Sequence, residues 1–151
     1  MADNDLKTLL HPVLNLPAHA KPAWGQMSAQ HMIEHLLQTL RLSNGKIEGQ
    51  CAYDDRRLPV LKRFLKSDKP MPRHFTNPLV GPELKALLFS DIDEAKKTLI
   101  KELDDFHDYF AKNPGATPVN PTFGQLTYEE WIMFHRKHMT HHLTQFKLIG
   151  E

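Results

Sequence analysis

The chain has 151 residues, of which 40% are hydrophobic and 25% are charged, a composition typical of a globular protein with one hydrophobic core. Its formal net charge of +1 gives no general reason to expect binding to nucleic acid or to a membrane surface. The start of the chain lacks the apolar run of a signal peptide, and no stretch approaches the length of a membrane span. The one cysteine, Cys51, excludes an intramolecular disulfide. We therefore expect a single domain, residues 1–151, in the cytoplasm.

Helix signals recur along the chain and are separated by proline-rich connections. A short helix is predicted over residues 5–10, before Pro12, and one or two helical turns over residues 83–89. Ser28 and Ser90 are suitable N-caps for two of the longer helices. No segment alternates apolar and polar residues for long enough to predict a sheet. The sequence therefore predicts an all-α fold, a four-helix bundle with long Pro-rich connections and with helices over residues 28–42, 56–67, 90–112 and 127–148.

The last predicted helix has the clearest boundaries. Thr127 and Glu130 have the spacing of a capping box, in which each side chain bonds the backbone N–H of the other residue. Leu126 and Trp131 have the spacing of the hydrophobic staple that accompanies such a cap. No proline or glycine follows until Gly150, which is the expected stop.

One face of this last helix combines apolar side chains with histidines. At about 100° per residue, the residues on that face are Trp131, His135, His138, Met139, His142, Phe146 and Ile149. His138 and His142 lie one turn apart near the middle of the face, so both imidazoles can bind the same metal ion. The alternative is that these are core histidines whose nitrogens are satisfied by hydrogen bonds. A closed metal site would need a third ligand from another helix.

The helix predicted over residues 28–42 offers His31 and His35 as candidates for that third ligand. Periodicity places His35 at the flank of the apolar face of its helix and favours a boundary or surface position for both histidines. Glu34 adjoins His35 and is expected on the polar, solvent-exposed side.

Two segments carry a resemblance to a known family. WGQMSAQHMIEHL at Trp24–Leu36 and NPTFGQLTYEEWIMFHRKHMTHHLTQF at Asn120–Phe146 resemble the two signatures of a domain family of unknown function in the DinB-like superfamily. The resemblance implies a four-helix bundle that holds a divalent metal through three histidines. At the matching positions of this chain, that histidine triad is His35, His138 and His142. His31 and His141 are not at matching positions, and whether they or His135 assist the site is open.

Three histidines around an ion leave a coordination position open, which is typical of catalytic rather than structural metals. Zinc or nickel is the expected ion, with iron or manganese as alternatives. The resemblance implies relatives that are transferases and isomerases using small thiols. The first hypothesis is therefore a metal-dependent hydrolase or thiol-dependent transferase. The second is a non-catalytic metal-binding module for stress response or sensing, and the third is a purely structural bundle.

A homodimer is the expected assembly. The resemblance implies pairing, since related bundles often pair, and three apolar residues of the last helix lie off its core-facing side, namely Met133, Leu143 and Leu148. A small thiol or another small molecule is the expected substrate.

Overall fold

The computed structural model describes residues 2–73 and 84–150, and this part of the chain is mostly helical. In chain order the elements are α1 (Ala2–Leu10), the 3-10 helix η1 (His11–Asn15), α2 (Ala29–Ser43), α3 (Leu58–Leu65), α4 (Ile92–Lys112), β1 (Val119–Asn120), β2 (Gly124–Gln125) and α5 (Tyr128–Gln145). None of the helices in these two ranges is both long and apolar enough to cross a membrane.

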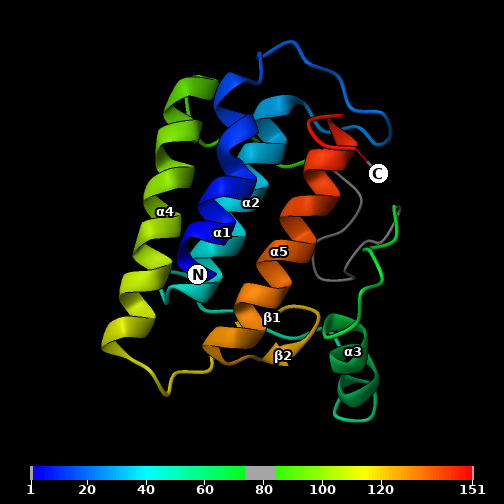
Figure 1. The fold of residues 1–151 in the computed structure, drawn as a ribbon, viewed down its shortest axis with the longest axis vertical. Helices are drawn as coiled ribbons and strands as arrows, with labels where there is room; N and C mark the ends of the chain where they lie inside the picture. The colour runs from blue at the N-terminus through cyan, green and yellow to red at the C-terminus, as the bar shows by residue number, and fades with distance from the viewer. Residues whose placement is uncertain (1, 74–83, 151) are drawn as a thin grey trace.

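Helices α1, α2, α4 and α5 lie side by side, as Figure 1 shows. The most extensive contact is between α2 and α4, and α1 packs on α5. Helix α3, predicted as one of the four bundle helices, stands apart from this group and contacts α5 (Figure 1). The mostly helical fold is confirmed, whereas the predicted four-helix bundle is not confirmed in the form expected. The short α1 takes the place beside α5 because Leu6 and Leu10 are fully buried in the core.

The core is apolar and lies among these four helices. Along the apolar face of α4, Ala95, Leu99, Leu103, Phe106 and Phe110 are buried, and Ile92 is half-buried. Leu143 of α5 is also completely buried. The expectation that Leu143 lies off the core-facing side was therefore wrong, because α1 covers the second side of α5.

A two-stranded antiparallel hairpin precedes α5 and was not predicted. Val119 pairs with Gln125 and Asn120 with Gly124, which is too short a ladder to show a period-two pattern. Gly124 has φ +77, and an added Cβ would lie 3.0 Å from the side chain of Leu58 on α3. The glycine thus serves both the turn and the close approach of α3.

The predicted helix starts are largely confirmed. The hydroxyl of Ser28 accepts the backbone N–H of His31 and caps α2, and the capping box of Thr127 is formed at α5. Helix α4 is capped by Asp91 rather than by Ser90. The carboxylate of Asp91 accepts the backbone N–H of Glu94, and an acidic cap also suits the positive end of the helix dipole.

Helix α5 ends about three residues earlier than predicted, at Gln145 rather than near 148. The Lys147 N–H donates to the Thr144 carbonyl and the Leu148 N–H to the Leu143 carbonyl, which together form a Schellman motif. The position that glycine usually takes in this motif is held by Lys147, with φ 60.

The turns predicted over residues 83–89 are not formed at residues 84–89, which are irregular, and residue 83 lies outside the described residues. Residues 74–82 of the Pro-rich connection also lie outside them. The 84–89 segment is held instead by hydrogen bonds to side chains of α2, which are described with the site below.

Candidate metal centre

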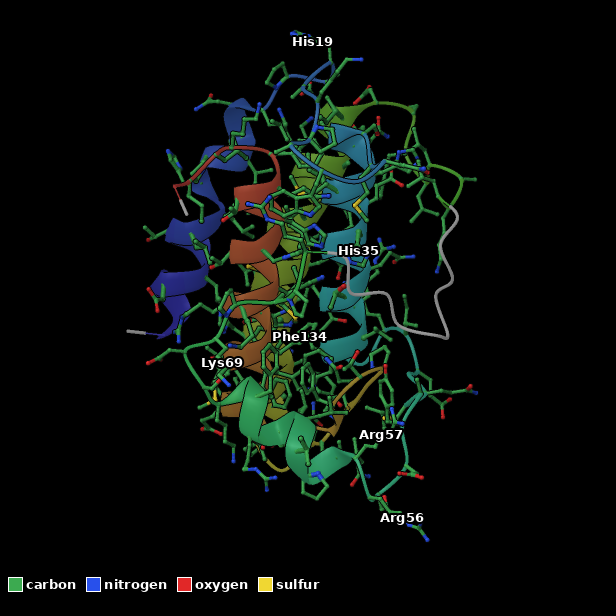
Figure 2. The ribbon with its side chains drawn as sticks, turned by 90° about the vertical axis from the view of Figure 1, so that its right-hand side faces the viewer. His19, His35, Arg56, Arg57, Lys69 and Phe134 are labelled. Carbon is green, nitrogen blue, oxygen red and sulfur yellow. The ribbon has the colours of Figure 1, made fainter. Side chains whose placement is uncertain are left out.

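The side chains of His35, His138 and His142 converge between α2 and α5. The Nε2 atom of His138 lies 2.9 Å from that of His35 and 3.2 Å from that of His142. One ligand atom from each residue lies within 4.8 Å of the other two, and the rings meet edge to face. Figure 2 shows His35 on α2 and Phe134 on the neighbouring α5.

The two helices position these residues for different reasons. His138 and His142 share a face of α5 because they are four residues apart, and both are buried. His35 is half-buried, at the flank of its helix as periodicity predicts. It reaches the cluster because α2 packs against α5 at this level.

Burial keeps the three imidazoles neutral. It lowers the pKa of His35 to about 4, with smaller repulsions from Lys85 and His141. It also lowers the pKa values of His138 and His142 well below the usual 6.5, and mutual repulsion among the clustered rings acts in the same direction. Near pH 7 each ring therefore has one nitrogen lone pair available to a metal ion.

A hydrogen bond to Gln145 decides which nitrogen of His142 faces the cluster. The Nδ1–H of His142 donates to Gln145 Oε1 over 2.7 Å, which leaves Nε2 without a proton. The Gln145 amide is itself fixed, because its Nε2 donates to the Trp24 carbonyl over 2.9 Å. Partners of this kind orient the imidazoles of metal sites.

The ring of His138 is held by packing. It stacks on Phe134 with a centroid distance of 5.0 Å and an interplanar angle of 28°. Its Nδ1 is buried and has no hydrogen-bond partner within the described parts of the chain. The hydrophobic wall of Phe134 thus sets the ring plane and shields the cluster from water on that side.

The donor set fits a divalent ion. Two nitrogens bound to one zinc ion at about 2 Å each would lie roughly 3 Å apart, as the paired Nε2 atoms do here. Neutral imidazoles suit zinc, nickel, copper and iron alike, so the ligands alone do not select among these metals.

His135, the third histidine predicted on the apolar face of α5, is buried but is not part of the cluster. Its Nε2 donates to the hydroxyl of Ser43 over 2.8 Å, and that hydroxyl donates to the Leu40 carbonyl. Burial, with a smaller repulsion from His107, lowers its pKa to about 3. His135 is a core histidine with a satisfied nitrogen, as the alternative interpretation of these residues proposed.

His31 and Glu34 hold the 84–89 segment. The Nδ1 of His31 accepts from the Ser28 hydroxyl, and its Nε2 donates to the Lys85 carbonyl over 3.0 Å. Glu34 was expected at the solvent-exposed side, but it is only 5% exposed. Its carboxylate accepts the backbone N–H groups of Leu88, at 2.6 Å, and Phe89, at 3.2 Å. That prediction was wrong because the returning chain covers the polar flank of α2.

His141 lies beside the cluster without joining it. Its ring meets those of His142 and Trp24 edge to face, at 4.9 Å and 5.7 Å between centroids. Burial and the nearby Arg73 lower its pKa, and a hydrogen bond to the Met71 backbone partly opposes them. Gln145 is a site residue that sequence reasoning missed, because it belongs to no ligand motif.

Fold and site define a mostly helical protein with a cluster of three histidines that can hold a metal ion. Residues 3–148 match the family described as "Protein of unknown function (DUF1569)", and the chain belongs to this family. No protein with a curated description and no solved structure matches the chain. The expectation of a domain family of unknown function is confirmed, and membership of the DinB-like superfamily stays a prediction.

Proposed function

We propose that His35, His138 and His142 bind one divalent metal ion, zinc or nickel before iron or manganese, and that the centre is catalytic. The observation that carries the proposal is the convergence of three neutral imidazoles, with neighbouring Nε2 atoms 2.9 and 3.2 Å apart. Hydrogen-bonded core histidines account less well for this cluster, because His138 Nε2 faces two other Nε2 atoms at once.

The reaction class that we propose is hydrolysis or thiol transfer. A dication with three neutral ligands keeps its full charge and lowers the pKa of a thiol or a water. The chain's own contribution is to keep the imidazoles neutral by burial, to orient His142 through Gln145, and to exclude water with Phe134. His35 is half-buried while the other two are buried, so the cluster is nearest to solvent at His35.

Metal content is the first test. The chain, purified without a polyhistidine tag, should hold about one metal ion, and His→Ala at any of the three positions should lower that content. His19→Ala, a change at an exposed histidine, is the matched control and should bind as wild type does. A triple variant that holds as much metal as wild type would place the site elsewhere.

Turnover separates an enzyme from a non-catalytic module. The protein loaded with zinc, nickel, manganese or iron would be offered glutathione or another small thiol together with an electrophilic acceptor. Turnover that requires both the metal and His138 supports the enzyme. A centre that holds its metal but is closed to thiol and azide favours the stress or sensing module.

We also propose a homodimer of the DinB-like kind in the reducing cytoplasm, where the free thiol of Cys51 would stay reduced. Met133, which is 37% exposed on α5, supports an apolar interface, whereas the buried Leu143 does not. Light scattering over a wide concentration range should give twice the chain mass. A monomer mass at every concentration would reject the dimer and would not bear on the proposed metal site.

A further inference from the structure

A cavity of about 430 Å³ lies at the C-terminal end of α5, on the side of Trp24. It is open to solvent, and the residues that line it are Ala23, Trp24, Arg73, Thr144, Lys147, Leu148, Ile149 and Gly150. Its volume suits a small molecule or the end of one.

Both charged residues in the described lining of this cavity are cationic. Arg73 and Lys147 line it together with Thr144, and no carboxylate is present among its described lining residues. The guanidinium of Arg73 lies over the Trp24 ring at 4.3 Å from the centroid, which holds the cation at the cavity wall. Two cations and a hydroxyl around one hollow are groups that recognise carboxylates and phosphates.

Lys147 occupies a position that its backbone does not favour. With φ 60 it has the left-handed conformation of the Schellman motif, where a Cβ strains the chain and glycine is the usual residue. Backbone strain of this kind points to a role for the side chain itself. The role available to the Lys147 side chain is to supply a positive charge to the cavity that it lines.

The cavity is joined to the three-histidine cluster by direct contacts. Trp24, in its wall, accepts a hydrogen bond from Gln145 through its carbonyl, and Gln145 accepts from His142. The ring of His141 contacts both Trp24 and His142. A molecule seated against Trp24 is therefore separated from the cluster by one layer of side chains.

We propose that this cavity binds the anionic group, a carboxylate or a phosphate, of a small molecule, and that the bound molecule lies one layer of side chains from the metal centre. Arg73 and Lys147 bind the anion and Trp24 provides the apolar wall. The link to the metal centre rests on the proposed function, whereas binding of the anion in the cavity does not.

The test is a titration of the full chain with inorganic phosphate and, separately, with succinate. A chelator is present, so that neither anion can bind through a metal. Binding is followed by the amide NMR signals of residues 144–150 and the indole signal of Trp24. Saturable shifts confined to these groups are expected. The anion with the lower dissociation constant shows whether the cavity prefers a phosphate or a carboxylate. Absence of saturable shifts with both anions would overturn the proposal.

Charge variants decide whether the cavity cations act. Lys147→Gln should weaken anion binding about tenfold, as expected for loss of one charged hydrogen bond, while Lys147→Arg should retain it. Lys97→Gln is the matched control, because it removes one positive charge from α4 at a side chain that is 77% exposed. Equal affinity in the Lys147→Gln and Lys97→Gln variants would overturn the proposal.

Relief of strain gives a second readout. Lys147→Gly should raise the melting temperature by about 2–4 °C, because glycine adopts this conformation freely, while anion binding falls as in Lys147→Gln. A lower melting temperature would refute the argument from strain. Metal content, measured on the same proteins, is expected to be unchanged. If the wild-type chain takes up metal but binds neither anion, this inference alone is rejected. If it binds an anion but takes up no metal, only the proposed function is rejected.

Discussion

Among single residues, the geometry of the histidine cluster depends on side chains that are not themselves proposed ligands. Gln145 sets the tautomer of His142 and ties it to the Trp24 backbone, while Phe134 sets the plane of His138. His135 resembles the ligands in sequence but bonds Ser43 instead. What distinguishes the proposed ligands from the core histidine in this helix is the contact of each ring: His142 bonds Gln145 and His138 stacks on Phe134, whereas His135 bonds Ser43.

The first prediction at this scale concerns Gln145. In Gln145→Ala, His142 loses the acceptor for its Nδ1–H, so its ring is free to rotate and to place a proton on Nε2. We expect metal affinity to fall about 10- to 100-fold with the helical circular dichroism retained. Gln38→Ala on α2, which removes a partner of Arg41 only, should leave metal affinity unchanged. Equal metal affinity in the two variants would contradict the role given to Gln145.

The second prediction concerns acid stability through His135. Its pKa is about 3 when folded and near 6.5 when unfolded, so the unfolded chain binds one more proton between these values. This residue's contribution is therefore present above pH 6.5 and is lost as the pH falls towards 3, at about 1.4 kcal/mol per pH unit. His135→Gln keeps a donor for Ser43 but does not titrate.

The measurement is urea unfolding at several pH values between 7.5 and 4.5, with a chelator present. Below pH 6.5 the free energy of unfolding of His135→Gln should fall less steeply with pH than that of wild type, by about 1.4 kcal/mol per pH unit. Above pH 7 the curves of stability against pH for the variant and for wild type should run parallel. Curves that stay parallel throughout would show that His135 takes up its proton in the folded state.

At the scale of elements, long-range hydrogen bonds to buried carboxylates join parts of the chain that no local pattern links. Glu102 of α4 is only 3% exposed and accepts from Arg41, Asn44 and Lys46 at the end of α2. Glu34 of α2 plays the corresponding part for the 84–89 segment. The sequence shows both as ordinary charged residues of helices.

The third prediction tests the Glu34 contact. Glu34→Ala removes the acceptor for the N–H groups of Leu88 and Phe89, so these amides should exchange with solvent deuterium faster, by about tenfold or more. Glu94→Ala, at an exposed residue of α4, is the control and should leave both rates unchanged. Unchanged protection in Glu34→Ala would mean that other contacts hold the segment.

At the scale of the whole molecule, the metal centre would connect His35 of α2 with His138 of α5, which are 103 residues apart in the chain. Such a connection stabilises only the folded state, because the unfolded chain does not bring the three histidines together. The α2–α5 contact is modest beside that of α2 with α4, so the metal would strengthen the less extensive of the two interfaces.

The fourth prediction follows from this linkage. Free zinc or nickel at about 100 times its dissociation constant should stabilise the fold by about 2.7 kcal/mol and raise the melting temperature by about 5–10 °C. A chelator should reverse the rise. His138→Ala should abolish it, and His19→Ala should not. The same rise in His138→Ala would assign it to metal bound elsewhere.

Features that depend on residues within one helical turn could be predicted from the sequence. Capping at Ser28 and Thr127 and the shared face of His138 and His142 follow from helical geometry alone. His35 was assigned through family resemblance, since periodicity alone favoured a boundary position for it.

Which elements meet depends on tertiary packing. It placed α1 beside α5, set α3 apart, buried Glu34 and brought His35 Nε2 to within 2.9 Å of His138 Nε2. The physical reason is that the free energy of these contacts comes from burial and hydrogen bonding between segments far apart in the chain. Composition and hydrophobic periodicity describe each segment only in isolation. They therefore show which face of a helix is buried but not which element covers it.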